Sequence, residues 1–284
     1  MKKLLQILFV LFLLPALSFA QTTVAAAEII AKINRGEAVS YKNVRITGDV
    51  DLTQLKNKKL ETEAENDSNT KTYVSTVTVP LSFSNCTFTS KVLAYHNPNA
   101  NAITFFGSDD NELFKTNFTK DVRFENCTFE EENAFKYSRF DGAVSFAGSH
   151  FKEEALFKYT HFNKGSANFR RTTYSETANF KYVNLAEGIN FTQASFLDDA
   201  DFKYAKFPQG SSFEKATFTG FANFKYAKFT GPNLKGISFN GGSQDFKYTK
   251  VNGRSANLAS WSGLWFKWFW DRLWLISVGE EKVN

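Results

Sequence analysis

The chain has 284 residues and a formal net charge of +5, so it is weakly basic rather than acidic. It contains 32 phenylalanines but only three histidines and two cysteines. Because a metal site built on nitrogen or sulfur needs several such ligands close together, this composition argues against one. No phosphate-binding glycine loop or nucleophile elbow occurs either, so we expect no catalytic residues, no metal and no cofactor.

Residues 1–20 have the three parts of a secretory signal peptide. Lys2 and Lys3 form a charged start, an apolar run covers residues 4–14, and Ser-Phe-Ala at 18–20 forms a small-x-small cleavage site. A transmembrane anchor is the alternative interpretation. We expect an exported protein, located in the periplasm, in the outer envelope or outside the cell.

Residues 21–36 are predicted to form an N-terminal helical cap. The helix itself runs from Val24 to Arg35, with Ile30 and Ile33 on one face together with Ala26 and, less centrally, Ile29. A stack of repeats needs a cap because an open end exposes apolar core groups and unpaired strand backbone.

Residues 37–258 are organised around the hexapeptide FKYAKF, which occurs at 202–207 and again at 224–229. A fixed period of 20–50 residues is typical of stacked repeats. Polar runs near 56–72 and 92–111 break the pattern and are predicted as loops. The leading phenylalanine of FKY recurs after 22 residues, once after 23, at positions 135, 157, 180, 202, 224 and 246.

Each repeat divides into four segments, because a large apolar residue recurs every five or six positions, as at Phe124, Phe129, Phe135 and Phe140. A small residue usually stands two positions earlier. An α-helix needs apolar steps of three and four, and a strand needs steps of two, so neither fits. The spacing fits a chain that runs extended for two or three residues, points a small and a large residue inward, and then turns a corner.

The units Ala178-Asn179-Phe180, Ala200-Asp201-Phe202, Ala222-Asn223-Phe224 and Ala256-Asn257-Leu258 resemble the pentapeptide-repeat family. The resemblance covers about 122–258 closely and 41–118 loosely. It implies an all-β fold, a right-handed quadrilateral β-helix with the central Phe or Leu and the preceding small residue inside. It implies little about function, because repeat scaffolds host unrelated roles.

Cys86 and Cys127 occupy matching contexts, each at the small inward position. Export permits a disulfide, which requires the two residues to lie on neighbouring coils. A small buried cysteine is also ordinary packing, and both interpretations stay open.

The FKY repeats place lysine and tyrosine at matching outward positions of successive coils. One interpretation is a stacked tyrosine column that covers the backbone, with lysine ammonium groups directed outward. The other is a basic aromatic face that binds an anionic or sugar polymer by charge attraction and ring stacking. The candidate binding residues are Lys136, Lys158, Lys181, Lys203, Lys225, Lys247, Tyr137, Tyr159, Tyr182, Tyr204, Tyr226 and Tyr248. A second column around the corner contains Arg139, His161, Asn184, Lys206, Lys228 and Lys250.

Residues 259–284 form an aromatic tail that contains all five tryptophans and is predicted as a helix. It could cap the last coil, form a dimer seam, or lie in a membrane interface, where tryptophan is favoured.

Three functional classes follow. The first is a non-enzymatic envelope or secreted scaffold that binds a protein or an anionic polysaccharide. The alternative within this class is a membrane-associated or dimerising structural protein that acts through the tryptophan-rich tail. The second is the DNA mimic that regulates topoisomerases, known among pentapeptide-repeat proteins, but it needs a cytoplasmic, strongly acidic surface, and a nucleic-acid partner is not expected in vivo. The third, a carbohydrate-active β-helix enzyme, is disfavoured because a phenylalanine core leaves no evident cleft.

Overall fold

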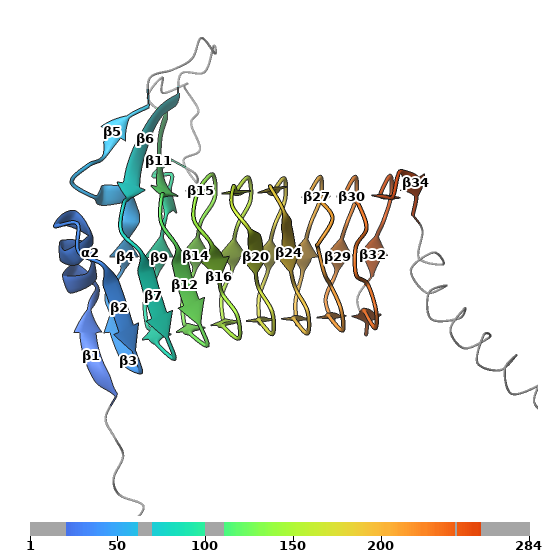
Figure 1. Cartoon of the computed structure of the whole chain (residues 1–284), viewed down its shortest axis with the longest axis horizontal. Helices are drawn as coiled ribbons and strands as arrows, with labels where there is room; N and C mark the ends of the chain where they lie inside the picture. The colour runs from blue at the N-terminus through green and yellow to red at the C-terminus, as the bar shows by residue number, and fades with distance from the viewer. Residues whose placement is uncertain (1–20, 62–69, 100–110, 242, 257–284) are drawn as a thin grey trace, which may run out of the picture.

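The computed structural model describes residues 21–61, 70–99, 111–241 and 243–256 (Figure 1). The predicted signal peptide and the tryptophan-rich tail lie outside these ranges. Within the described residues, no helix combines the length and the hydropathy needed to cross a membrane.

The chain winds into a four-sided stack in which each coil adds one short strand to each side, so neighbouring strands are parallel (Figure 1). The first side is a six-stranded sheet, which isolated bridges extend through Asn190, Ser212 and Asn233. Its strands are β2 (Val39–Lys42), β7 (Leu81–Ser84), β12 (Val122–Glu125), β16 (Val144–Ser145), β20 (Ser166–Asn168) and β24 (Gly188–Asn190).

The second side is a nine-stranded sheet, and the third side is an eight-stranded one. The second side contains β1 (Thr22–Ala25), β3 (Val44–Thr47), β8 (Thr87–Phe88), β13 (Thr128–Phe129), β17 (His150–Phe151), β21 (Thr173–Tyr174), β25 (Ser195–Phe196), β28 (Thr217–Phe218) and β31 (Ser238–Phe239). The third contains β4 (Val50–Asp51), β9 (Val92–Leu93), β14 (Asn133–Ala134), β18 (Ala155–Leu156), β22 (Ala178–Asn179), β26 (Ala200–Asp201), β29 (Ala222–Asn223) and β32 (Gln244–Asp245), and the short helix η2 (Leu52–Gln54) follows β4.

The fourth side consists of a seven-stranded sheet followed by a four-stranded one. The first of these contains β5 (Lys59–Leu60), β6 (Thr70–Val77), β10 (Tyr95–His96), β11 (Asn111–Phe118), β15 (Arg139–Phe140), β19 (His161–Phe162) and β23 (Asn184–Leu185). The second contains β27 (Lys206–Phe207), β30 (Lys228–Phe229), β33 (Lys250–Val251) and β34 (Arg254–Ser255).

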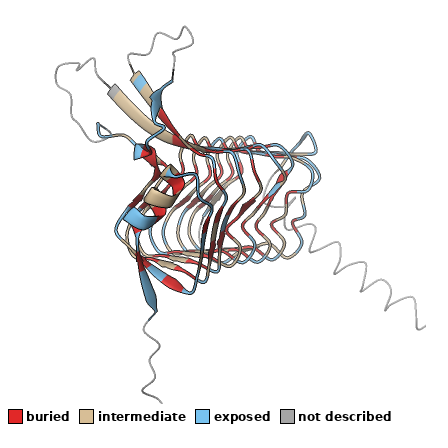
Figure 2. Ribbon diagram, turned by 60° about the vertical axis from the view of Figure 1, so that its left-hand side comes forward, coloured by how far each residue is buried: buried red, intermediate tan, exposed pale blue. Residues whose placement is uncertain are grey.

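The core consists of four columns of large apolar side chains, one behind each side, and buried residues line the interior (Figure 2). Phe157 is fully buried, and its ring stacks on Phe135 at 5.1 Å and on Phe180 at 4.9 Å. It meets Phe169 of an adjacent column edge-on, at an interplanar angle of 85°. Burying each such ring contributes about 1.5–3 kcal/mol. The coils are therefore held together by ring stacks as well as by backbone hydrogen bonds.

The N-terminal helix is shorter than predicted. Helix α2 (Ala26–Asn34) begins two residues after Val24, because Thr22–Ala25 form strand β1 and pair with β3. The helix buries Ala26, Ile29 and Ile33 against the first coil, whereas Ile30 is only half-buried. Ile29, rather than Ile30, therefore lies at the centre of the buried face of the helix.

The two segments predicted as loops contain strands, which corrects that prediction. Both leave the stack at the corner between the third and fourth sides, on consecutive coils, so their flanking strands meet. Strands β6 and β11 pair in parallel over eight residues, from Thr70↔Asn111 to Val77↔Phe118. Strands β5 and β10 add to them in antiparallel fashion. Pairing satisfies backbone groups that loops would leave to water.

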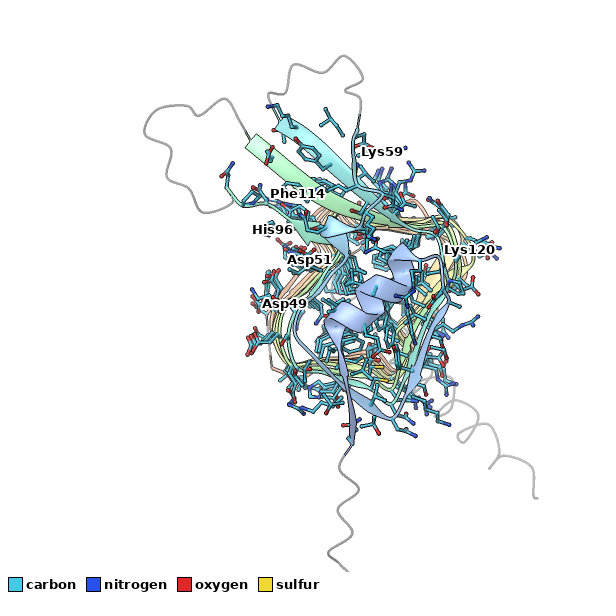
Figure 3. The ribbon with its side chains drawn as sticks, turned by 90° about the vertical axis from the view of Figure 1, so that its left-hand side faces the viewer. Asp49, Asp51, Lys59, His96, Phe114 and Lys120 are labelled. Atoms are coloured by element: carbon cyan, nitrogen blue, oxygen red, sulfur yellow. The ribbon has the colours of Figure 1, made fainter. Side chains whose placement is uncertain are left out.

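These strands project from the N-terminal end of the stack as an extension, here named the flap: Lys59–Leu60, residues 70–75, Tyr95–His96 and residues 111–116 (Figures 1 and 3). Tyr73 and Phe114 stack on it at 5.0 Å, and His96 lies beside Phe114 (Figure 3). The ammonium of Lys115 contacts Glu61 at 2.7 Å.

Candidate functional site: a tyrosine column between two cationic columns

The tyrosines of the FKY repeats occupy the corner between the third and fourth sides. Each Phe-Lys-Tyr-x segment closes a turn, as where the N–H of Ser138 donates to the carbonyl of Phe135. The tyrosine adopts a left-handed backbone conformation in every copy, with φ between 55° and 62°. This conformation costs a non-glycine residue about 1–3 kcal/mol, so the surroundings must stabilise it.

Stacking between the tyrosine rings supplies part of that stabilisation. From Tyr137 to Tyr248, successive rings lie 4.6–5.0 Å apart with interplanar angles of 1–18°. Each aromatic pair contributes about 0.5–1.5 kcal/mol beyond area burial. Because both faces of the inner rings are covered by neighbours, these tyrosines present ring edges and hydroxyl groups to solvent.

The lysines that precede these tyrosines lie along the column rather than extending away from it. The ammonium groups of Lys136, Lys158, Lys203, Lys225 and Lys247 lie 5.0–5.6 Å from the centre of the adjacent tyrosine ring. Burial, followed by the charges of Lys136 and Lys181, lowers the pKa of Lys158. The ladder residues are thus in cation–π contact and repel each other mildly.

Lys181 differs from the other ladder lysines. Its ammonium lies 3.0 Å from the carboxylate of Asp201, one coil further along the stack. Asp201 also accepts a hydrogen bond from the backbone N–H of Lys203, and Asn223 does the same for Lys225. The third side therefore carries a column of acceptors beside the lysine ladder, and its acids reduce the net positive charge there.

The second cationic column predicted from the sequence is also formed. Arg139, His161 and Asn184 are in register on the fourth side, and Lys206, Lys228 and Lys250 are in register further along it. These three lysines are exposed, whereas burial lowers the pKa of His161. On three coils, both columns therefore carry lysine. We name this region the lysine corner: Lys203, Lys206, Lys225, Lys228, Lys247 and Lys250.

Tyr95 is a residue that the sequence pattern missed. It lies on flap strand β10, and its hydroxyl is 3.1 Å from the ammonium of Lys136. Its ring lies 5.9 Å from that of Tyr137, at a tilt of 55°. Residues 94–96 read Ala-Tyr-His, so the FKY motif is absent and periodicity alone could not find it. The tyrosine column thus begins at the flap.

The histidines do not converge. His150 lies on the second side, where its Nε2 is 2.7 Å from the hydroxyl of Ser175, and His161 lies on the fourth side. In the described part of the chain, no three His, Cys, Asp or Glu residues are grouped to hold a metal ion. The absence of a metal and a cofactor stays a prediction.

A family model described as "Pentapeptide repeats (9 copies)" matches residues 113–161, 135–184, 157–206 and 180–228. Neither a search of curated proteins nor a search of solved structures returned a match. The matched segments cover the coils whose inward phenylalanines and outward ladder are described above. The predicted four-sided β-helix is confirmed, and residues 113–228 of this chain match the family model of pentapeptide repeats.

Proposed function

We propose that the chain is a non-enzymatic, exported β-helical scaffold that binds an anionic polymer along the lysine corner. The observation that carries the proposal is the register of Lys206, Lys228 and Lys250 on the fourth side, beside the lysine and tyrosine ladder at the corner with the third side. Six lysines thus stand in two columns, one on each side of a column of tyrosines.

The geometry suits a linear ligand rather than a small molecule. Neighbouring coils are spaced by about 4.8 Å, so the ammonium groups form two lines parallel to the axis of the stack. A polyanion lying along that axis meets several charges at once and releases bound counterions, which makes its affinity depend on salt. Each lysine contributes little alone, because exposed charges are strongly screened.

The stacked rings change the expected mode of contact. A sugar ring cannot stack on Tyr204, because Tyr182 and Tyr226 cover its two faces at 4.6 Å and 4.7 Å. Along these inner rings, contact must use tyrosine hydroxyl edges and lysine ammonium groups. This favours a polymer that carries sulfate, carboxylate or phosphate groups over a neutral glycan, and it argues against ring stacking by the ligand along the inner part of the column.

The other functional classes have less support. The positive corner is opposite in sign to the surface that a DNA mimic requires. An enzyme needs converging acid and base groups, and the described histidines and ladder lysines lie in separate or parallel columns. A role for the tryptophan-rich tail in membrane contact or dimerisation falls outside the described residues.

The test uses the full chain and heparin as the anionic probe. Replacing Lys206, Lys228 and Lys250 together by alanine should weaken binding several-fold and make its salt dependence shallower. The control removes equal charge elsewhere, at Lys152, Lys164 and Arg170, and should bind nearly as wild type. Equal losses in the two variants, or no salt-sensitive binding by wild type, would overturn the proposal.

A further inference from the structure

Cys86 and Cys127 lie directly above one another in the stack. The pairs on both sides of them have the same offset: Ser84 pairs with Glu125, and Thr87 pairs with Thr128. Strands paired in this way are about 4.8 Å apart, which lies within the range of Cα separations that disulfides span. Both thiols are free and buried.

The two side chains also point in the same direction. The preceding residues, Asn85 and Asn126, share the left-handed backbone conformation, with φ of 53° and 52°. The backbone therefore enters each cysteine in the same way, and the Cα–Cβ bonds are parallel rather than divergent. The Sγ of Cys127 lies 3.6 Å from the carbonyl oxygen of Phe83, which places that sulfur against the coil that contains Cys86.

Cys86 and Cys127 lie at the corner between the first and second sides, where the next coil carries a serine, Ser149. In reduced form, their thiols make the contacts that the serine hydroxyl makes there. The hydroxyl of Ser149 donates to the carbonyl of Phe124 on the coil below, and the thiol of Cys86 makes the corresponding contact with Tyr41 at 3.6 Å. A serine hydroxyl can therefore make the same hydrogen bond at this position, so the fold does not require a cysteine there. Yet the only two cysteines of the chain occupy consecutive coils of one column. That placement brings the two sulfur atoms close together. Packing alone does not require it, because serine fills the same position on the next coil.

We propose that Cys86 and Cys127 are an oxidation site, which closes into a disulfide between neighbouring coils when the chain folds in the presence of a disulfide donor. With oxidised glutathione as donor, one cysteine thiolate attacks the glutathione disulfide and expels one reduced glutathione. The second cysteine thiolate attacks the protein sulfur of the mixed disulfide and expels the other. Two thiols are oxidised, one disulfide is reduced, and the two protons pass to glutathione.

The two thiols also interact electrostatically in the folded stack. The hydrogen bond between the thiols lowers the pKa of Cys86 and, together with burial, raises the pKa of Cys127. These opposite shifts show that the two sulfurs lie close enough in the folded stack to affect each other's protonation.

The bond would fasten the coil that carries β10 and β11 to the coil that follows it. A disulfide stabilises chiefly by restricting the unfolded chain, so the oxidised stack should unfold at a higher temperature. Because the folded thiols are buried, oxidation should take place during folding rather than on the finished stack.

The experiment refolds the full chain from denaturant, either in a glutathione redox couple or in a thiol reductant alone. After unfolding and alkylation, mass spectrometry should find two alkylated thiols in the second sample. The first sample should carry no alkyl group, and its mass should be two hydrogens below that of the reduced, unalkylated chain. The oxidised sample should melt at a higher temperature. The serine variant C86S/C127S, which uses the residue native at position 149, should melt at the same temperature in both conditions.

Two alkylated thiols after refolding in the glutathione couple would overturn the proposal. So would a disulfide that joins two molecules, which would appear as a dimer on a non-reducing gel. A change in melting temperature that persists in C86S/C127S would show that the redox buffer, not the disulfide, causes the shift.

Discussion

The ammonium of Lys181 lies 3.0 Å from the carboxylate of Asp201, although the two residues stand on successive coils. This contact divides the lysine ladder, because it neutralises one charge in the middle of the third side. Neighbouring coils carry Asn179 and Asn223 where this coil carries Asp201. The net charge along the lysine ladder therefore depends on whether each of these aligned positions carries a carboxylate or an amide.

The first prediction concerns that column. Replacing Asp201 by asparagine keeps an acceptor for the backbone N–H of Lys203 but frees Lys181, so heparin binding should tighten about two- to threefold. The reverse change, Asn223→Asp, adds a negative charge at the equivalent position and should weaken binding. Titrations of the two variants against heparin at low salt would measure the difference. Shifts of the same sign would show that this side does not take part in binding.

The second prediction concerns the core. Phe202 is fully buried between Phe180 and Phe224, so Phe202→Ala should lower the free energy of unfolding by about 3–5 kcal/mol. The neighbouring Lys203 is half-buried and its ammonium lies over its own tyrosine ring, so Lys203→Ala should cost less than about 1 kcal/mol. Denaturant titration would compare the two. Equal losses would contradict the assignment of inward and outward positions.

The third prediction concerns Tyr174, which stands between Phe151 and Phe196 in a column of buried rings. Its hydroxyl is buried without a hydrogen bond among the described residues, and the nearby hydroxyl of Thr172 donates to the carbonyl of Phe169. Burial raises the pKa of the Tyr174 phenol. Tyr174→Phe should therefore stabilise the protein by about 1 kcal/mol, measured by denaturant unfolding.

A matched control for Tyr174→Phe is Tyr204→Phe, in which the lost hydroxyl belongs to a half-buried ring of the surface column. That change should leave stability nearly unaltered. A loss of stability in Tyr174→Phe would mean that its hydroxyl has a partner, such as a buried water.

The fourth prediction concerns pH. Burial lowers the pKa of His150 and of His161, with smaller contributions from Lys152 in the first case and from Arg139 in the second. Between the lowered folded pKa and the unfolded value of about 6.5, the unfolded chain binds more protons. Stability should therefore rise with pH through that window and fall as the pH drops below about 6.5.

Substitutions taken from neighbouring coils isolate this effect. His150→Thr and His161→Asn introduce the residues found one coil further along, Thr173 and Asn184. The double variant should lose part of the acid sensitivity in its melting temperature. An unchanged pH profile would assign the sensitivity to carboxyl groups instead.

The sequence by itself determined the repeat, the number of sides and the inward residues. Core residues of a stacked coil recur at fixed intervals, so the series Phe124, Phe129, Phe135 and Phe140 already encodes the corners. The same periodicity placed Lys203 and Tyr204 outward in columns, because stacked coils bring equivalent positions together. It also placed Cys86 and Cys127 at matching inward positions.

Only the tertiary structure decided what those columns can contact. Whether tyrosine rings face solvent or each other depends on their backbone conformation and on the separation of the coils, and neither is written in the spacing of the residues. The ion pair between Lys181 and Asp201 and the position of Tyr95 beside Lys136 join different coils, so no local pattern predicts them.

The flap is likewise formed by contacts between different coils, which a local sequence pattern does not show. Two polar interruptions in sequence became paired strands, because their ends leave the stack at one corner of consecutive coils and lie within hydrogen-bonding distance. The breaks in the period were visible in sequence. The pairing of β6 with β11 was not, because it depends on the parallel stacking of the coils from which they emerge.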